Sequence, residues 1–431
     1  MNEKVYPKLL IISHNLFDTS NNIGKTLVSL LDGWPKDRIS QIFFRNDKPS
    51  FNYCSEYYCV TDKEILKSTL SFGARKAGSS LTSCDDSSVS ATENSLYTIG
   101  NHRHPIVSLI RDTLWCLSNW KTNELSEWLL TVAKPDLILF VPNDYCLAYR
   151  FALYVERIVN KPIVPFYMDD AFYWNCKTSF IDGYRRKELR KLAAKIHEYS
   201  GDILTICDFM SEEYHDLFNR NCWAFANSVK VSKPRTNDDL HNPIIFTYLG
   251  NLHSNRWKSL VEIANVLGEI EKRNGIKCEL HVYSGSLLED RMKIAFANNN
   301  YIKFMGSVKA DQVRGKQIES DILVHVETFD TRSINSTRLS LSTKIPEYLS
   351  TGVPVFAYGP SNISSMKYLS KYELGQVCYQ TYSLYTTIKD ILLIPELRVK
   401  LSNNGINRAK NYHNIDEVAN RFQNILIKYK I

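Results

Sequence analysis

The chain has 431 residues, of which 44% are apolar and 23% are charged. This length exceeds one ordinary hydrophobic core and predicts two domains, and the composition excludes disordered and fibrous classes. The start, "MNEKVYPKLLIIS", lacks the pattern of a signal peptide, and no apolar run approaches the roughly 20 residues that span a bilayer. We therefore expect a cytoplasmic protein.

Cysteine spacing and charge disfavour two classes of protein, zinc-binding and nucleic-acid-binding proteins. The ten cysteines are scattered without a CxxC pair or a Cys/His cluster, which argues against zinc and favours buried free thiols. The net charge of +7 falls within residues 251–431, where 24 Lys and Arg face 17 Asp and Glu. That excess suits a half that binds an anion. It is spread thinly and no nucleic-acid motif accompanies it, so a nucleic-acid binder is disfavoured.

Short runs rich in Ile, Leu and Val alternate with segments of helical length along the chain. The strand-like runs are "KLLIIS", "DLILFV", "PIVPFY" and "DILTIC", followed by "IIFTYLG", "CELHVYSG", "DILVHVE" and "VPVFAYG". Amphipathic helical segments include 257–273 and 311–319. This alternation predicts an α/β fold with two Rossmann-like domains, whose parallel sheets carry helices on both faces.

Two polar stretches interrupt the alternation. Residues 233–242 contain a proline and no apolar periodicity, and we predict a linker there between an N-terminal domain (1–232) and a second domain that begins at 243. The stretch 78–95 has seven serines in eighteen residues and predicts a flexible loop within the first domain.

The turn after the first strand contains Gly24 and Lys25 in "SNNIGKT". A phosphate-binding P-loop needs a further glycine five positions before Gly24, and Thr19 stands there, so an ATPase or GTPase is disfavoured. The glycine still allows a close backbone approach at the start of the first helix, where an anion would be favoured. His14 in "IISHNLFD" is a weaker candidate for the same edge.

The strand "PIVPFY" is followed by Asp169 and Asp170. Either aspartate could act as a base towards a hydroxyl, and either could cap the following helix; the two interpretations stay equally open. Two adjacent aspartates could suggest Mg²⁺, but the sequence shows no second carboxylate cluster in support of a metal ion.

Residues 184–196, "YRRKELRKLAAKI", carry six Lys and Arg and one Glu, while Leu189, Leu192, Ala193 and Ile196 can share one helical face. Such a helix can lie on an anionic membrane surface. The alternative is a solvated charged face above an apolar stripe that packs on the core.

The most informative stretch is "STKIPEYLSTGVPVFAYG", residues 342–359. It predicts a short helix capped by Ser342 or Thr343 and ended by a glycine, with a strand after it. The start of a helix favours an anion, and Lys344 adds a full positive charge there. One turn further, the carboxylate of Glu347 could accept hydrogen bonds from two hydroxyl groups, as in a ribose.

This stretch resembles the donor domain of GT-B glycosyltransferases, specifically glycosyltransferase family four. The resemblance extends through 248–264, 302–308 and 407–426, and thus covers nearly all of 243–431. It implies the GT-B fold, in which parallel sheets of two domains face a central cleft. The implied order is an acceptor domain (1–232), a nucleotide-sugar domain (243–412) and a last helix (413–431) that crosses back to the first.

The resemblance also implies roles for particular residues. Glu347 would bind the ribose, while Ser342, Thr343 and Lys344 would line the diphosphate. Gly250 would make the turn after the first donor-domain strand, and Arg256 would keep one of two phosphate-binding cations, since Asn251 replaces the other. In the first domain, Gly24 and Lys25 would form the opposite half of a shared site.

Two departures from the family affect the sugar and the acceptor. In the family, seven residues separate the ribose glutamate from a preceding glutamate, and Leu339 stands at that preceding position instead. Asp330 or Glu327 could take over that contact, and the choice stays open. A histidine that many relatives carry near the reacting sugar is replaced by Met168, which leaves Asp169 and Asp170 as the catalytic candidates.

The implied reaction is transfer of a sugar from a nucleotide-sugar to an acceptor hydroxyl with retention of configuration, and with neither metal nor cofactor. Partners would be the donor, a sugar, glycan or lipid-linked acceptor, and an anionic membrane contacted through 184–196. The resemblance suggests polysaccharide biosynthesis at the inner face of the cell membrane. Two alternatives stay open, a nucleotide-sugar epimerase or hydrolase of the same fold, and a degenerate protein that only binds.

Overall fold

A computed structural model describes residues 5–81, 105–170, 172, 179–231, 233–235 and 239–429. The chain forms two compact units. Unit 1 comprises residues up to Ala226 together with those from Val418 onward, and unit 2 comprises Asn227–Glu417. The chain therefore enters unit 2 once and returns to unit 1 for its last helix.

Unit 1 is built on an eight-stranded sheet in which only the β3–β4 pair is antiparallel. In sheet order its strands are β4 (Ser79–Leu81), β3 (Glu56–Cys59), β2 (Ile39–Phe43), β1 (Leu9–Ser13), β5 (Leu137–Phe140), β6 (Ile163–Tyr167), β7 (Asp202–Thr205) and β8 (Asn221–Ala224). The strand β1 is buried at every position, as expected of a central strand covered on both faces. The strands β1 and β5 are parallel, but β2 to β4 are added on one side of β1 and β5 to β8 on the other, which makes the β1–β5 pair the topological switch point.

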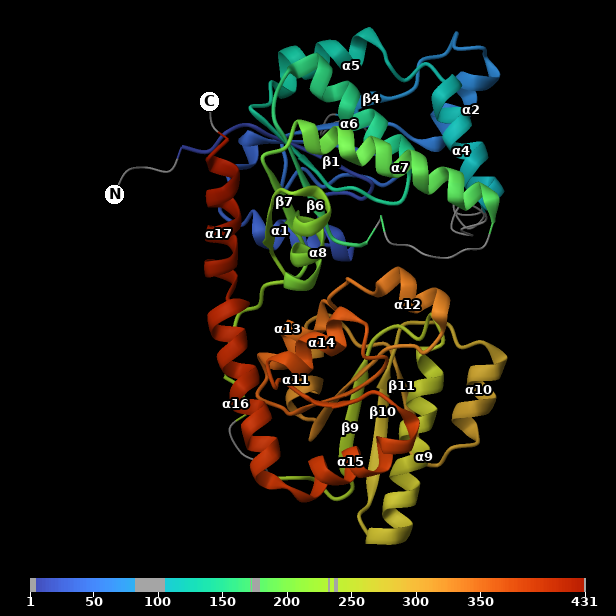
Figure 1. The fold of residues 1–431 in the computed structure, drawn as a ribbon, viewed down its shortest axis with the longest axis vertical. Coiled ribbons are helices and arrows are strands. Elements are labelled where there is room, and N and C mark those ends of the chain that lie inside the picture. The colour runs from blue at the N-terminus through green and yellow to red at the C-terminus, as the bar shows by residue number, and fades with distance from the viewer. Residues whose placement is uncertain are drawn as a thin grey trace. The chain divides into compact units, whose positions relative to one another are not determined.

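Helices cover both faces of this sheet (Figure 1). They are α1 (Asn22–Leu30), α2 (Asp62–Leu70), α4 (Pro105–Leu117), α5 (Asn123–Glu127), α6 (Cys146–Val159), α7 (Phe180–Glu198), α8 (Asp208–Phe218) and α17 (Ile415–Ile427), with a 3-10 turn at Lys36–Arg38 and a π-helical turn at Trp128–Ala133. The helices α4, α6 and α7 pack against one another. The helix α17 packs near α1, because Gln423 donates hydrogen bonds to the carbonyls of Leu30 and Asp32.

Unit 2 contains a six-stranded sheet in which all pairs are parallel. In sheet order its strands are β11 (Ile302–Gly306), β10 (Cys278–Tyr283), β9 (Ile244–Leu249), β12 (Ile322–Val326), β13 (Val355–Tyr358) and β14 (Gln376–Cys378). This is the order of a dinucleotide-binding Rossmann sheet, and its switch point lies between β9 and β12.

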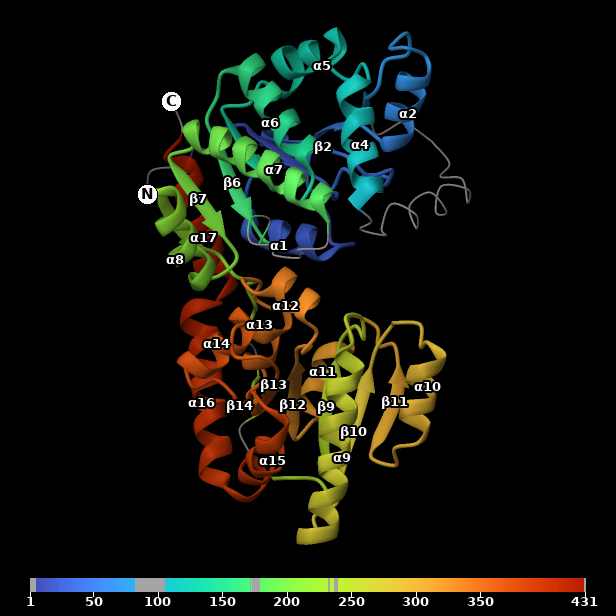
Figure 2. The same cartoon turned by 45° about the vertical axis from the view of Figure 1, so that its right-hand side comes forward.

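The helices of unit 2 are α9 (Arg256–Asn274), α10 (Asp290–Ala297), α11 (Val313–Ile318), α12 (Thr331–Thr337), α13 (Lys344–Leu349), α14 (Ser364–Lys371), α15 (Leu384–Leu393) and α16 (Pro395–Tyr412), with a 3-10 turn at Thr381–Ser383. Figure 2 shows α9 running along β9 and β10. Its buried residues Leu260, Ile263 and Leu267 recur at helical spacing and join Phe246 and Val324 of the sheet in one core. Burying each such side chain contributes about 1.5–3 kcal/mol before chain entropy is counted.

The predicted α/β fold with two Rossmann-like parallel sheets is confirmed, and all eight predicted strand runs contain strands. The sequence interpretation missed β2, β3, β4, β8 and β14. The predicted serine-rich loop is wrong for Ser79–Leu81, which pair with β3, while residues 82–95 lie outside the described residues. The units divide at Ala226, upstream of the predicted linker 233–242.

Two further expectations were that the cysteines are buried free thiols and that no segment spans a bilayer. Six of the free cysteines there are buried, namely Cys54, Cys59, Cys146, Cys207, Cys278 and Cys378, while Cys222 is half-buried and Cys116 is exposed. Among the described helices, none has both the length and the apolar character needed to cross a bilayer.

Candidate functional site

The candidate binding residues of unit 2 lie at the carboxyl edge of its sheet. Gly250 follows β9, Glu327 follows β12 and Gly359 follows β13, so three neighbouring strands end in one place. In open parallel sheets, ligands bind at this edge beside the switch point. The two glycines keep the edge open, because a Cβ on Gly359 would lie 2.8 Å from the Cβ of Glu327.

Gly250 makes room for the ammonium group of Lys344. A Cβ on Gly250 would lie 1.9 Å from Lys344 Nζ and 2.8 Å from the hydroxyl oxygen of Tyr248. Lys344 begins α13, and its Nζ also lies 5.3 Å from the centre of the Tyr248 ring, at cation–π distance. Two residues that the sequence singled out separately are thus brought together.

An ion pair fixes a second cation at the same edge. Arg256 Nη2 lies 2.9 Å from Glu327 Oε2, and the Glu327 side chain is only 3% exposed. Arg256 also donates to Asn251 Oδ1 at 3.1 Å, while Ser259 donates to the backbone carbonyl of Glu327. Arg256 is therefore held from both sides at the first turn of α9, where the helix presents its own N–H groups.

The electrostatics of this group favour a bound anion. Burial would raise the pKa of Glu327, but His325, whose Nε2 lies 3.2 Å from Glu327 Oε1, and Arg256 together hold this pKa at about 2. Glu327 is thus a carboxylate at neutral pH. Burial, assisted by Arg256, lowers the pKa of Lys344 to about 8, although Glu327 and Glu347 oppose the shift. At neutral pH two cations therefore share the edge with one fully engaged carboxylate.

The helix α13 differs in detail from the predicted one. It begins at Lys344 without a side-chain cap from Thr343, and the N–H of Ser342 instead donates to Ser365 Oγ at 3.0 Å. Glu347 is exposed on this helix, close enough for its charge to act on Lys344. The second half of α13 is anchored to β9, because the Leu249 N–H donates to the Tyr348 hydroxyl. The predicted backbone turn is present at Gly352, whose φ is +75°.

The two alternatives for the acidic residue before α13 occupy different environments. Asp330 caps α12, where its Oδ2 accepts hydrogen bonds from the N–H and the hydroxyl of Ser333. Glu327 lies at the sheet edge with Arg256. The structure thus brings Glu327, rather than Asp330, together with the two cations.

In unit 1, Gly24 is required by a close approach of the loop that precedes α1. A Cβ there would lie 2.1 Å from the carbonyl oxygen of Asp18 and 2.7 Å from that of Leu16. Asn21 caps the helix by accepting from the Gly24 N–H at 2.8 Å. Lys25 is exposed beside this turn. The glycine therefore serves the loop itself, whatever the loop binds.

A buried glutamine that the sequence interpretation missed supports the same loop. Gln41 of β2 accepts from the Phe17 N–H and donates to Ser13 Oγ and to the Asn15 carbonyl. It is fully buried. The signal in the sequence is a lone amide within the apolar run "ISQIFF", since a buried amide must find partners.

His14 lies at the carboxyl end of β1, at the switch point of unit 1. Burial, followed by the charge of Arg111, lowers the pKa of His14 to about 3, so its imidazole is neutral at physiological pH. Its buried Nδ1 has no hydrogen-bond partner within the described ranges, and its ring centre lies 5.9 Å from that of Tyr145.

The two aspartates after β6 differ from each other. Asp170 is buried, and its Oδ1 accepts from the Phe172 N–H at 3.1 Å and from the Tyr214 hydroxyl at 3.2 Å. Asp169 is exposed. Asp170 thus links β6 to α8, and of the two only Asp169 faces solvent.

The basic segment 184–196 forms the middle of α7, and its apolar stripe is not available to lipid. Leu189, Ala193 and Ile196 are buried, and Arg185 is buried in an ion pair with Asp112 at 2.9 Å. The interpretation of a charged face above a core-facing stripe therefore describes this helix, with Lys187, Lys191 and Lys195 exposed. Figure 1 shows α7 packed beside α4 and α6.

Within the described ranges, no group of three or more His, Cys, Asp or Glu side chains is placed to hold a metal ion. The expectation of a reaction without metal or cofactor stays a prediction.

Comparison with known proteins addresses the fold. No protein-family model matches the chain, and no curated protein sequence matches it. Solved GT-B glycosyltransferases do share its architecture over almost the whole chain, so the fold is GT-B, as predicted. The assignment to family four stays a prediction.

Three of these structures illustrate the likeness. HepE from Anabaena, solved in complex with UDP and glucose, has a TM-score of 0.63 at 12% identity and covers 98% of this chain and 100% of its own. Sucrose-phosphate synthase from Thermosynechococcus elongatus has a TM-score of 0.60 at 12% identity, with 97% and 98% covered. The lipopolysaccharide outer core galactosyltransferase WaaB has a TM-score of 0.58 at 14% identity, with 98% and 99% covered.

Proposed function

We propose that this protein is a glycosyltransferase that moves a sugar from a nucleotide-sugar to an acceptor hydroxyl. One observation carries the proposal: Arg256 and Lys344 converge where Gly250 leaves the end of β9 open. A nucleotide-sugar offers a diphosphate, and two cations with a helix start form the complementary site. The structural neighbours add support, because HepE was solved with UDP and with UDP-glucose, and TarM with UDP.

Each residue of the edge has a distinct part in donor binding. Arg256 and Lys344 bind the diphosphate, and Glu347, exposed one turn into α13, accepts hydrogen bonds from the ribose hydroxyls. Glu327 is a positioning residue, since its carboxylate is engaged with Arg256 and almost completely buried. Ser342 and Thr343 complete the diphosphate loop through their position before Lys344.

In the reaction, the bond from the anomeric carbon to the diphosphate oxygen breaks while the acceptor oxygen bonds to that carbon. Negative charge develops on the diphosphate, where Arg256 and Lys344 are already oriented, so they stabilise the transition state more than the ground state. We propose retention of configuration, with the departing phosphate oxygen taking the acceptor proton, and no metal ion. Asp169, exposed after β6, orients the acceptor.

A neutral hollow beside the cationic edge suits a sugar. Its volume is about 650 Å³, and the residues that line it are Phe329, Pro360, Ser361, Asn362, Tyr379, Gln380, Thr381 and Tyr382. These residues follow β12, β13 and β14, so the hollow continues the edge that carries Glu327. Aromatic rings with a few amides and hydroxyls, and no charge, suit an uncharged glycan. We propose that a glycan in polysaccharide assembly is the acceptor.

Calorimetric titration with UDP, GDP and ADP tests the proposal. The wild type should bind one of them with micromolar or better affinity, and Arg256→Gln should weaken it by roughly tenfold or more, since a charge-assisted contact contributes about 1.5–3 kcal/mol. Arg291→Gln is the matched control, because Arg291 pairs with Glu289 on the surface of α10. Equal affinities of the two variants, or no binding by any nucleotide, would refute the site.

A positive titration is followed by a test of chemistry. The nucleotide identified is supplied as its sugar derivatives with a panel of glycan acceptors, and the product is examined by NMR. An acceptor glycoside with the donor's anomeric configuration is expected. Free sugar or an epimer formed without acceptor would instead identify a hydrolase or an epimerase.

A further inference from the structure

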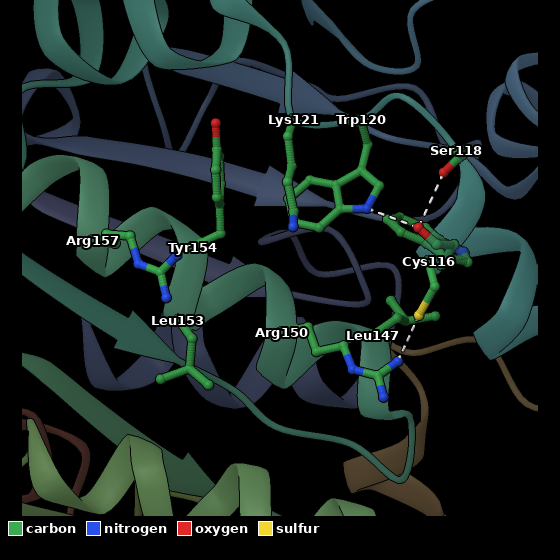
Figure 3. A pocket seen from close by; sticks show the side chains of 10 residues that line it. Cys116, Ser118, Trp120, Lys121, Leu147, Arg150, Leu153, Tyr154 and Arg157 are labelled. Carbon is green, nitrogen blue, oxygen red and sulfur yellow. Dashed lines mark hydrogen bonds between the residues drawn. The ribbon is translucent and has the colours of Figure 1, made fainter. Parts of the chain in front are cut away.

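A second hollow lies in unit 1, between α4 and α6. Its volume is about 400 Å³, and it is lined by Trp115, Cys116, Ser118, Trp120, Lys121, Leu147, Arg150, Leu153, Tyr154 and Arg157. These residues come from the end of α4, the segment after it, and α6 (Figure 3). The hollow is large enough for a small organic ligand.

One face of α6 supplies the long wall of this hollow. Arg150, Leu153, Tyr154 and Arg157 follow one another at i, i+3, i+4 and i+7, the spacing that places side chains on a single helical face. With a rise of 1.5 Å per residue, the two arginines lie about 10 Å apart along the axis. The uncharged side chains of Leu153 and Tyr154 lie between the two arginines on this face.

The hollow carries three cations, and the carboxylates whose charges interact with them, Glu188 with Arg150 and Glu156 with Arg157, lie outside its lining. Within the described ranges, Arg150, Arg157 and Lys121 make no ion pair, and the lining contains no carboxylate. Arg150 Nη1 lies 2.8 Å from Cys116 Sγ, a weak acceptor. The nearby Glu188 of α7 is bonded to Lys191 at 2.9 Å. Three positive charges in one concave wall raise the local concentration of anions.

Aromatic rings give the hollow its second property. Lys121 Nζ lies 5.3 Å from the centre of the Trp120 ring and 5.7 Å from that of Tyr154. Trp120 is held in place from behind, stacked on Phe151 at 4.8 Å between centroids. Figure 3 shows Lys121 lying beside the Trp120 ring, with Tyr154 and Arg157 on α6. The cationic ends are thus joined by rigid apolar walls, which favour an organic ligand over a hydrated inorganic ion.

We propose that this hollow is a binding site for an organic dianion, a ligand whose two phosphate or carboxylate groups are joined by an uncharged segment. One anionic group contacts Arg150 and the other contacts Arg157, while the uncharged segment lies against Leu153 and Tyr154. Sugar bisphosphates and acidic glycans both have this chemistry. The site is separate from the nucleotide edge of unit 2 and stands independently of the proposed glycosyl transfer.

Titration calorimetry at one pH and one salt concentration, with UDP present throughout, compares three probes. Inorganic phosphate represents a single anion, fructose 1,6-bisphosphate a free organic dianion, and a galacturonate oligosaccharide an acidic glycan. The variant Arg150→Gln/Arg157→Gln removes both ends of the site. The control Lys187→Gln/Lys195→Gln removes the same charge from exposed positions on α7. Lys121→Gln, at an exposed position, provides a second test, and thermal melts verify that each variant is folded.

A bridged dianion should bind the wild type at least about tenfold more tightly than inorganic phosphate, because two charge-assisted contacts replace one. That preference should disappear in Arg150→Gln/Arg157→Gln, weaken in Lys121→Gln, and persist in the control. A preference for the bisphosphate alone identifies a free small molecule, and a preference for the oligosaccharide identifies an acidic glycan. The proposal is overturned if neither dianion exceeds phosphate, or if the arginine variant and the control behave alike.

Discussion

Replacing Gly250 by alanine should abolish the lysine half of the anion site while leaving the fold in place. The added Cβ would lie 1.9 Å from Lys344 Nζ, and no rearrangement of the backbone is needed to relieve this contact, because Nζ is the end of a flexible side chain. The nearest rigid neighbour is the Tyr248 hydroxyl at 2.8 Å, which needs a shift of a few tenths of an ångström. The ammonium should therefore move away from the edge.

The magnitude follows from the contact that is lost. A hydrogen bond between a charged group and its partner contributes about 1.5–3 kcal/mol, which corresponds to roughly a tenfold to 150-fold loss of affinity for a nucleoside diphosphate. Unfolding free energy should fall by less than about 1.5 kcal/mol, as for a minor steric adjustment. Binding and stability should thus respond very differently to this substitution.

A double-mutant cycle separates the lysine from every other effect of the methyl group. Nucleotide affinity is measured by calorimetry for the wild type, Gly250→Ala, Lys344→Met and the double variant. If the glycine acts by admitting the lysine, Gly250→Ala should have almost no effect in the Lys344→Met background. Gly315→Ala is the control, because a Cβ at that helical position meets nothing within 4 Å.

Two results would refute this reasoning. Equal losses of affinity from Gly250→Ala in both backgrounds would show that the methyl group blocks the ligand directly and that the lysine is irrelevant. Wild-type affinity in Gly250→Ala would show that the ammonium of Lys344 contributes nothing to the site.

Three further expectations concern charge and packing. Glu327→Gln should lower the free energy of unfolding by about 3 kcal/mol in urea titrations, because Arg256 then lacks its buried partner. Affinity for a nucleoside diphosphate should fall as pH rises above about 8, since the Lys344 pKa is about 8 and only the protonated amine attracts the anion. Gly24→Ala should lower the stability of the protein by about 1–3 kcal/mol in thermal melts, because its Cβ would lie 2.1 Å from the Asp18 carbonyl oxygen.

Each of these has a companion measurement. Glu319→Gln, at a surface Lys–Glu pair, should change stability by less than about 1 kcal/mol, and a loss equal to that of Glu327→Gln would contradict the buried-pair account. The alkaline loss of affinity should vanish in Lys344→Met; if it persists there, another group is titrating. Gly183→Ala, where a Cβ meets nothing within 4 Å, should be neutral or stabilising, and an unchanged melt of Gly24→Ala would show that the loop yields easily.

Sequence patterns reveal strands that are apolar throughout, and they fail where a buried strand contains polar or aromatic residues. Runs such as "KLLIIS" are recognisable because central parallel strands exclude polar side chains on both faces. The strand β2 was missed because Ser40 and Gln41 interrupt its apolar run, although both are buried. The strands β3 and β14 are short, and one is rich in tyrosine.

Candidate residues could be named from the sequence, but not the contacts among them. Gly250 was named through the family resemblance and Lys344 for its place at a helix start, and their proximity depends on α13 starting beside the end of β9. The choice between Glu327 and Asp330 could not be made, since both follow the same strand. Burial and pairing distinguish their environments, because a carboxylate as deeply buried as Glu327 requires a cation such as Arg256, while the choice of the acid that contacts the sugar stays a prediction.

The division of the chain has a consequence for how the protein is made on the ribosome. Residues 227–417 are contiguous, so unit 2 can complete its core while synthesis continues. Unit 1 begins first but lacks the segment from Val418 onward, whose Gln423 and Tyr429 bond to Leu30 and Asp202, until that segment is synthesised. Domains usually mature in the order of their synthesis. Here unit 2, which emerges second, has its whole sequence before unit 1 does, because unit 1 must wait for the segment from Val418 onward.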